Sequence, residues 1–318
     1  MFHYRGFRNS DPPLVAALWR SRAGDPALVQ PVSVDLFEQL VFGKPHFDYA
    51  GLILALEDDR PVGFAHASFG PDAAGERIST ETGVICLIVV RPECEGAAVA
   101  AGLLERCEAY LQRHGAKVFY AGGVAPASPF YVGLYGGSET PGVLESDHVG
   151  RRLYPAHGYS AVDRVLLFRQ DLSSFRPPVD RQQVQWRRRL LVQVMMDTPA
   201  RSRWEAATVG DFESTLFELV PRGGGARLAY AVVRAMEWGS GGQPGRVAGL
   251  VGLFVEPGSH RQGLATHLIG EIARNLLGQG VSVLEAHAPE SNAPLLRLYQ
   301  KLAFRQVGEG IVYRKEVC

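Results

Sequence analysis

The sequence predicts an α+β protein in which one strand–turn–helix arrangement occurs twice. In the second half, residues 247–255 form an apolar run of strand character, and apolar residues then recur at helical spacing over residues 264–277. In the first half, a strand over residues 83–90 leads through Arg91-Pro92 into a helical pattern over residues 97–113. A repeat of this size predicts two tandem domains with related folds.

The end of each predicted domain repeats as well. The second copy carries Asn292, Leu295, Leu298-Tyr299 and Ala303-Phe304. The first copy carries Asp147, Gly150, Leu153-Tyr154 and Gly158-Tyr159 at matching positions. Polar residues and a Pro pair at 171–178 follow a strand over residues 162–169 and predict the linker. We therefore expect one domain over residues 1–175 and another over residues 176–318.

The turn over residues 256–263 has the composition of an anion site. The first backbone N–H groups of a helix have no internal partner, and the helix dipole favours negative charge at that end. Gly263 would let a ligand approach the backbone closely, and Arg261 adds positive charge beside it. The turn predicts a phosphate site, and an ordinary junction with a capping glycine is the alternative.

Two motifs resemble those of the GNAT acetyltransferases. Residues 260–265 resemble motif A of that family, Gln/Arg-x-x-Gly-x-Gly/Ala, with His260 where the family prefers Gln or Arg. Residues 285–304 resemble the family's strand, Asn-x-x-Ala-x-x-Leu-Tyr helix and Gly-Phe turn, with Leu295 and Ala303 replacing the usual small residue and glycine. The resemblance implies that each domain has a mostly antiparallel central sheet flanked by helices. The tandem arrangement resembles that of the mycothiol synthase family, and a shared architecture leaves the acceptor open.

The resemblance also implies roles for individual residues. In the family, motif A holds the pyrophosphate of acetyl-CoA. The implied cofactor-binding residues are Phe254, Val255, His260, Arg261, Gln262, Gly263, Leu264, Ala265, Thr266 and Asn292. A backbone N–H near Phe254 or Val255 is expected to stabilise the oxyanion.

Two catalytic residues are expected in the second copy. Tyr299 stands where the family uses a tyrosine to protonate the departing CoA sulfur, and it should lie on almost the same helix face as Asn292; packing in the core is its alternative role. Glu285 occupies the place of the catalytic glutamate of some members. His287, Glu256 or water are alternatives as the base, and a carboxylate without a role is a further alternative.

The first copy differs from the second in two ways. Glu95 stands where the second copy has His260, and Ala98 replaces the key glycine. A carboxylate beside a pyrophosphate is repulsive by on the order of a kcal/mol even in water, so the N-terminal domain should be degenerate as a CoA site. The first half also has early helical segments, at residues 14–22 and 34–41, for which the second half has little room.

Composition limits the remaining possibilities. A formal net charge of zero argues against a nucleic-acid partner. No apolar run approaches the roughly 20 residues of a membrane helix, and Arg5 and Arg8 argue against a signal peptide, so we expect a soluble, cytoplasmic protein with no membrane contact. Four cysteines without metal-ligand spacing predict free thiols and no metal.

Three further segments have ordinary explanations. The glycine clusters at 222–226 and 239–245 are expected to be hairpin turns. Arg187-Arg188-Arg189 is expected to be a solvated face or to form interdomain salt bridges rather than a nucleic-acid patch. The aromatic insertion at 129–137 is expected to pack in the core rather than line a pocket.

The sequence therefore predicts an N-acetyltransferase whose C-terminal domain transfers the acetyl group of acetyl-CoA directly to an amine. The acceptor would be a small-molecule amine or a peptide N-terminus, which the sequence does not identify. A non-catalytic acyl-CoA sensor or scaffold, and a transferase that uses another acyl donor, are the alternatives. The oligomeric state is open.

Overall fold

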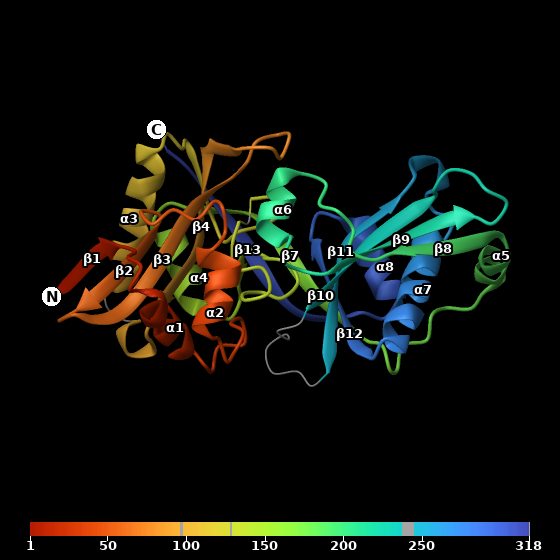
Figure 1. Cartoon of the computed structure of the whole chain (residues 1–318), viewed down its shortest axis with the longest axis horizontal. Coiled ribbons are helices and arrows are strands. Elements are labelled where there is room, and N and C mark those ends of the chain that lie inside the picture. Colours follow the sequence, from red (N-terminus) through yellow and green to blue (C-terminus); the bar gives the residue numbers. More distant parts are fainter. Residues whose placement is uncertain (96–97, 128, 237–244, 318) are drawn as a thin grey trace. The chain divides into compact units, whose positions relative to one another are not determined.

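The computed structural model describes residues 1–95, 98–127, 129–236 and 245–317 (Figure 1). The chain forms two compact units. Unit 1 comprises Met1–Val165, Ala200–Asp211 and Glu309–Cys318, and unit 2 comprises Leu166–Pro199 and Phe212–Gly308. These units depart from the expected domains 1–175 and 176–318 because two later segments of the chain belong to unit 1.

Unit 1 contains the first repeat. Its strands are β1 (Phe2–Gly6), β2 (Leu52–Glu57), β3 (Arg60–Pro71), β4 (Ile78–Val90), β5 (Val118–Ala121) and β6 (Val143–Leu144), with parts of β7 (Ser160–Asp171) and β13 (Arg305–Glu316). Its helices are α1 (Pro12–Arg20), α2 (Val34–Phe37) with the π-helical turn η1 (Glu38–Phe42), the short 3-10 turn η2 (Pro92–Cys94), α3 (Val99–Arg113), α4 (His148–Ala156) and α6 (Arg203–Val209). The strand order is β1-β2-β3-β4-β5-β13.

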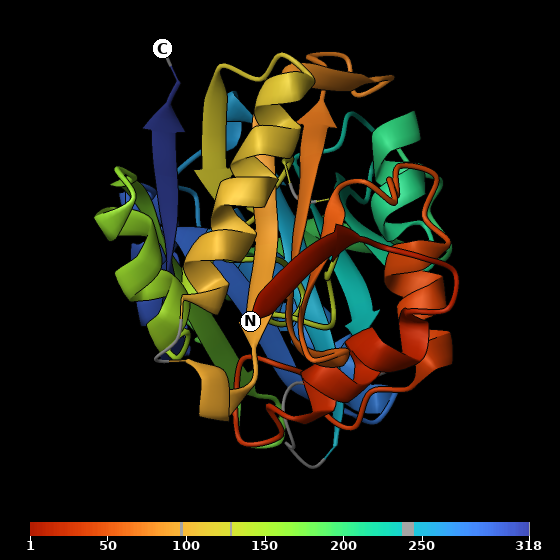
Figure 2. The same ribbon diagram turned by 90° about the vertical axis from the view of Figure 1, so that its left-hand side faces the viewer.

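The core of unit 1 lies between this sheet and α3. Val99, Leu103, Cys107 and Leu111 recur every four residues on α3, so they form one apolar stripe, and all four are fully buried. Alternate residues of β2 and β3 point to opposite sides of the sheet, and those facing α3 complete the same cluster. Figure 2 shows α3 and α1 on opposite sides of the strands of unit 1.

Unit 2 contains the second repeat. Its sheet has the order β7-β12-β11-β10-β9-β8. Besides the end of β7, its strands are β8 (Leu190–Met195), β9 (Ser214–Pro221), β10 (Ala229–Met236), β11 (Arg246–Val255) and β12 (Val281–Pro289). Its helices are α5 (Arg181–Arg189), the 3-10 turn η3 (Pro257–Ser259), α7 (Leu264–Gly278) and α8 (Ala293–Lys301). Buried residues of α7 and α8 pack in one cluster with the strands. Both helices are drawn in blue in Figure 1.

The two units share the arrangement that the repeat predicted. In unit 1, β4 and β5 pair in parallel up to Ile85 and Ala121, and in unit 2, β11 and β12 pair in parallel up to Leu250 and Ala286. The other strand pairs described within each unit are antiparallel. The prediction of an α+β fold with two related, mostly antiparallel sheets is confirmed. Beyond their last paired residues β4 and β11 continue without the parallel partner, so each sheet opens at this point.

The last strand of each sheet explains the unexpected division of the chain. Residues of β13 pair antiparallel with β5 in unit 1, with Tyr313 opposite Ala121. Residues Leu166 onward in β7 belong to unit 2, where β7 neighbours β12. Each sheet is therefore completed by the strand that follows the other repeat in the sequence.

Several smaller expectations can be compared with the structure. The glycine cluster at 222–226 is a turn between the antiparallel strands β9 and β10, as predicted. The cluster at 239–245 lies almost entirely outside the described residues. Between β8 and β9 only the seven-residue α6 forms, and it belongs to unit 1. Cys86, Cys94 and Cys107 are free thiols. Among the described helices, none has both the length and the apolar character needed to cross a membrane.

Candidate functional site

The N-terminus of α7 is an open set of hydrogen-bond donors. Gly263 is the N-cap residue with φ of 72°, a left-handed conformation that glycine adopts without steric cost, and it has no side chain to cap the helix. The first helical bond is donated by the His267 N–H to the Gly263 carbonyl at 3.0 Å. The N–H groups of Leu264, Ala265 and Thr266 therefore precede the helical ladder, and these three residues line a cavity.

This cavity has a volume of about 700 Å³ and lies where β11 separates from β12. Its walls come from the end of β11, the turn before α7, the first turn of α7, and α8. The lining residues that the sequence predicted are Phe254, Val255, His260, Arg261, Gly263, Leu264, Ala265, Thr266 and Asn292. The others are Leu253, Ser259, Pro294, Leu295, Arg297, Leu298 and Lys301.

The cavity has a strongly positive lining. Arg261, Arg297 and Lys301 line it, and no Asp or Glu does so among the residues that the structure describes. Within the same residues none of these three cations forms an ion pair. Arg297 and Lys301 were not predicted from the sequence, although their i, i+4 spacing on the helix that begins after Asn292 was a signal for cations on one face. A polyanionic ligand fits this lining.

Three predicted residues form local hydrogen bonds in the turn before α7 and at the start of α8. The His260 Nε2–H donates to the Val255 carbonyl at 2.8 Å, so this ring holds the turn against the end of β11. Asn292 caps α8 because its Oδ1 accepts the Leu295 N–H at 3.2 Å. Gln262 does not line the cavity. Its side chain donates to the Gly258 carbonyl at 3.3 Å, and its own carbonyl accepts a hydrogen bond from α5.

Glu285 belongs to a buried polar cluster on β12. The carboxylate is 1% exposed and accepts a hydrogen bond from Arg169 Nε on β7 at 3.1 Å. The Nε2 atom of His287 lies 3.4 Å from its other oxygen. The His287 side chain is buried, and neither ring nitrogen has a hydrogen-bond partner among the described residues. Buried polar atoms in this state usually contact water or a ligand.

Tyr299 is buried on α8 and is not one of the residues that line the cavity. Its side chain is 2% exposed and packs with the rings of Phe168 and Phe304, with centroid distances of 5.3 and 5.0 Å. Asn292, which we expected on almost the same helix face, is the N-cap of α8 with φ of −86° and ψ of 66°, and it lines the cavity whereas Tyr299 does not. Neither Tyr299 nor Glu285 lines the cavity wall.

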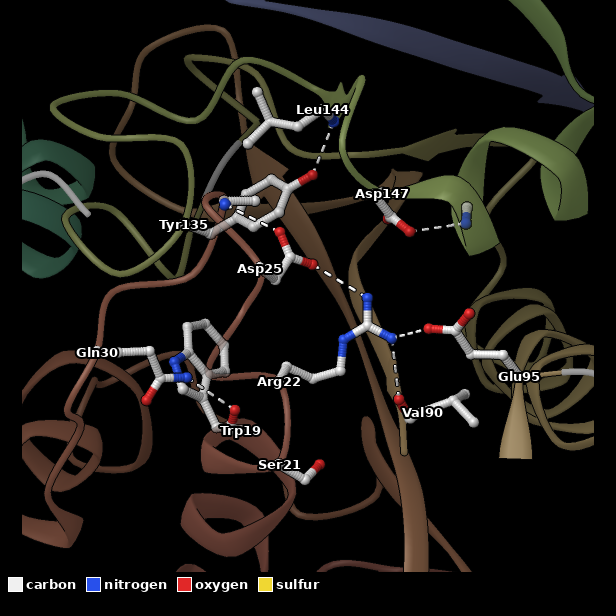
Figure 3. Close-up of polar contacts among 12 residues, drawn as sticks. Trp19, Ser21, Arg22, Asp25, Gln30, Val90, Glu95, Tyr135, Leu144 and Asp147 are labelled. Atoms are coloured by element: carbon white, nitrogen blue, oxygen red, sulfur yellow. Dashed lines mark hydrogen bonds and ion pairs between the residues drawn. The ribbon is translucent and has the colours of Figure 1, made fainter. Parts of the chain in front are cut away.

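The corresponding place in unit 1 is almost filled (Figure 3). The Arg22 guanidinium forms an ion pair with Glu95, and it donates to the Val90 carbonyl at 3.4 Å and to Asp25 at 3.1 Å. The remaining cavity beside Arg22 and Asp147 measures about 20 Å³, which is room for about one water molecule.

Acidic groups also distinguish this place from the cavity of unit 2. Asp147 matches Asn292 as the cap of its helix, accepting the Gly150 N–H at 2.8 Å. Burial raises the pKa of Asp147 to about 6. The Asp25 and Glu95 carboxylates therefore pair with the Arg22 guanidinium, and the Asp147 carboxyl lines the same small cavity. These acidic groups disfavour the binding of a polyanion at this place in unit 1.

Comparison with known proteins is consistent with this geometry. The profile of the Acetyltransferase (GNAT) family matches residues 16–135 and again residues 189–304. The two matches cover most of the chain and fall on the two repeats. The chain therefore belongs to the GNAT acetyltransferase family, whose general reaction is acyl-CoA-dependent N-acetyl transfer. No curated protein matches the chain.

Solved structures show the same fold over the whole chain. One is a tandem GNAT protein from the clavulanic acid biosynthesis pathway, with 17% sequence identity and a TM-score of 0.68, covering 99% of this chain and 98% of its own. A GCN5-related N-acetyltransferase from Sphaerobacter thermophilus has 15% identity, a TM-score of 0.65, and coverages of 99% and 95%. The glucosamine N-acetyltransferase region of a fungal multi-domain enzyme has 16% identity and a TM-score of 0.71, and covers 99% of this chain and 38% of that one. At these identities the similarity establishes the tandem fold alone.

Proposed function

We propose that unit 2 binds acetyl-CoA in the cavity beside α7 and transfers its acetyl group to the amine of a small molecule or a peptide N-terminus. The observation that carries this proposal is the lining of the cavity. Uncapped N–H groups at a helix start and three cations without a carboxylate suit a ligand with several phosphate groups. Among the residues that the structure describes, the cavity beside Arg22 in unit 1 measures only about 20 Å³.

Each part of the donor has a complementary part of the cavity. The diphosphate would lie at the N–H groups of residues 263–266 beside Arg261. The apolar pantetheine arm would lie against Leu253 and Leu298, where β11 has lost its parallel partner. Arg297 and Lys301 supply positive charge for the additional phosphate on the ribose. Beyond Leu250, β11 still pairs with β10 but no longer with β12. In an antiparallel pair only every second residue directs its backbone N–H toward the partner strand. The N–H groups of the other residues of β11 therefore face the opening and can stabilise an oxyanion.

The chemistry requires one proton to leave the amine and one to reach the thiolate. The amine nitrogen attacks the thioester carbonyl carbon, a C–N bond forms, and the C–S bond breaks. An alkylammonium with a pKa near 10 is mostly unreactive at neutral pH, so a base helps. We assign Glu285 as this base, with His287 beside it as the alternative acceptor, and Tyr299 as the acid that protonates the sulfur.

The polar cluster supports the assignment of Glu285. Arg169 neutralises its charge and holds one carboxylate oxygen, and the other oxygen faces His287 at 3.4 Å. Glu285 and His287 flank Ala286, the last residue of β12 that pairs with β11, so both lie where the two parallel strands open. A proton can therefore pass between the opening and the carboxylate through the unpartnered His287 ring.

A thiol-release screen tests the proposed activity. Acetyl-CoA and the full chain are incubated with simple amines, amino sugars and peptide N-termini, and free CoA is measured. At least one class should give turnover that Gly263→Glu abolishes and Ala98→Glu, the matched change in the first repeat, leaves near wild type. Binding without CoA release across the panel would favour the sensor, and a strong preference for another acyl-CoA would favour a different donor.

A further inference from the structure

Helix α5 reaches the turn before α7 with two side chains. The Trp186 Nε1–H donates to the Gln262 carbonyl at 2.8 Å. The Gln183 side-chain amide donates to the Gly263 carbonyl at 3.1 Å. These residues lie about 80 positions before the turn in the sequence, so the contacts join the segment after the linker to the loop of the cavity.

Peptide geometry gives these two bonds a directional consequence. The C=O and N–H of a trans peptide point in opposite directions. Because α5 holds the Gln262 and Gly263 carbonyls, the N–H groups of Gly263 and Leu264 must point away from α5. Both residues line the cavity on the other side. The bonds from α5 therefore fix the orientation of the two donors that a bound phosphate would meet first.

Gln183 is itself held from three sides. Its backbone N–H donates to the capping Asp180 at 2.8 Å, its Oε1 lies 3.1 Å from the His267 Nδ1 one turn into α7, and the residue is 6% exposed. Gly263 is fitted to this contact, since a Cβ at this position would lie 3.1 Å from the Gln183 amide nitrogen. A fixed side chain of this kind can orient a backbone group without first losing its own freedom.

We propose that α5 is a clamp on the phosphate loop and that Gln183 and Trp186 are positioning residues for donor binding. The clamp rests on the proposed acetyl-CoA site in unit 2. It predicts that the two residues control donor affinity through the loop and have little effect on the chemical step.

The test uses Gln183→Met, which keeps length and volume but removes both hydrogen bonds, and Trp186→Phe, which removes the indole donor. Gln185→Met, an exposed position on the same helix, is the matched control. One neutral hydrogen bond corresponds to roughly 2- to 10-fold in affinity. Each variant should weaken acetyl-CoA binding and raise its KM by about that factor with kcat nearly unchanged, and the double variant should do so by more than either.

A second readout separates the clamp from the proposed function. In the absence of ligand, hydrogen exchange at the His267 amide, which donates the first helical bond of α7 to the clamped Gly263 carbonyl, should become faster in both variants and stay at the wild-type rate in Gln185→Met. If wild type did not bind acetyl-CoA, faster exchange would still support the clamp while the proposed function failed. If Trp186→Phe and Gln183→Met both kept the wild-type exchange rate and the wild-type affinity for acetyl-CoA, the clamp proposal would be overturned. If Gln183→Met does not fold, the result for Trp186→Phe decides.

Discussion

Replacing Tyr299 by Phe is expected to lower acetyl-transfer turnover by about 10²- to 10⁴-fold, the typical effect of losing a positioned general acid. The ring contacts with Phe168 and Phe304 do not involve the hydroxyl, so α8 and the cavity should keep their structure. Acetyl-CoA affinity and melting temperature should therefore stay close to wild type. Steady-state kinetics, calorimetry and thermal unfolding measure the three quantities.

The alternative role of Tyr299 is packing alone. Tyr154, the matching tyrosine of the first repeat, is equally buried and provides the control. Loss of a hydroxyl that only packs costs about 1 kcal/mol of stability and little turnover. If Tyr299→Phe had near-normal turnover, as we expect for Tyr154→Phe, Tyr299 would not be the general acid.

Replacing Glu285 by Gln is expected to lower the rate at neutral pH by about 10²-fold or more and to let it recover toward high pH. The reason is that the free-amine fraction rises about tenfold per pH unit below an amine pKa near 10, so the need for a base disappears. Rates measured at saturating acetyl-CoA between about pH 6.5 and about pH 9.5 would show this recovery.

Parallel variants assign the base among the candidates. Gln cannot accept a proton but keeps the size of the side chain and can still accept a hydrogen bond from Arg169. His287→Gln and Glu256→Gln change the two alternatives in the same way. An unchanged pH–rate profile in Glu285→Gln, with a changed profile in one of the others, would move the role to that residue.

The local features of the site were predictable because they depend on short stretches of sequence. A strand, a left-handed turn residue and an amphipathic helix follow one another around Gly263, so the open N-terminus of α7 could be anticipated. The same holds for the cap at Asn292. The weaker repeat of this pattern in the first half predicted a second, related domain by the same reasoning.

The remaining features depend on contacts between distant residues. The alternation of β13 is the same whichever sheet it joins, so its pairing with β5 in unit 1 left no local signal. Arg22 meets Glu95 across 73 positions, and Gln183 meets Gly263 across 80. The ring contact between Tyr299 and Phe168 spans more than 100 positions, so helical spacing within α8 gave no signal for it.

Calorimetric titration of the intact chain with acetyl-CoA tests the central claim most directly. The account predicts one strong site per chain, because the cavity of unit 2 is open and positively lined, whereas among the described residues its counterpart in unit 1 is occupied by Arg22 and its acidic partners. Gly263→Glu should remove the site by adding a charge and a strained side chain at the N-cap, and Ala98→Glu should preserve it. Two equivalent sites per chain, or a strong site that survives Gly263→Glu, would contradict the account.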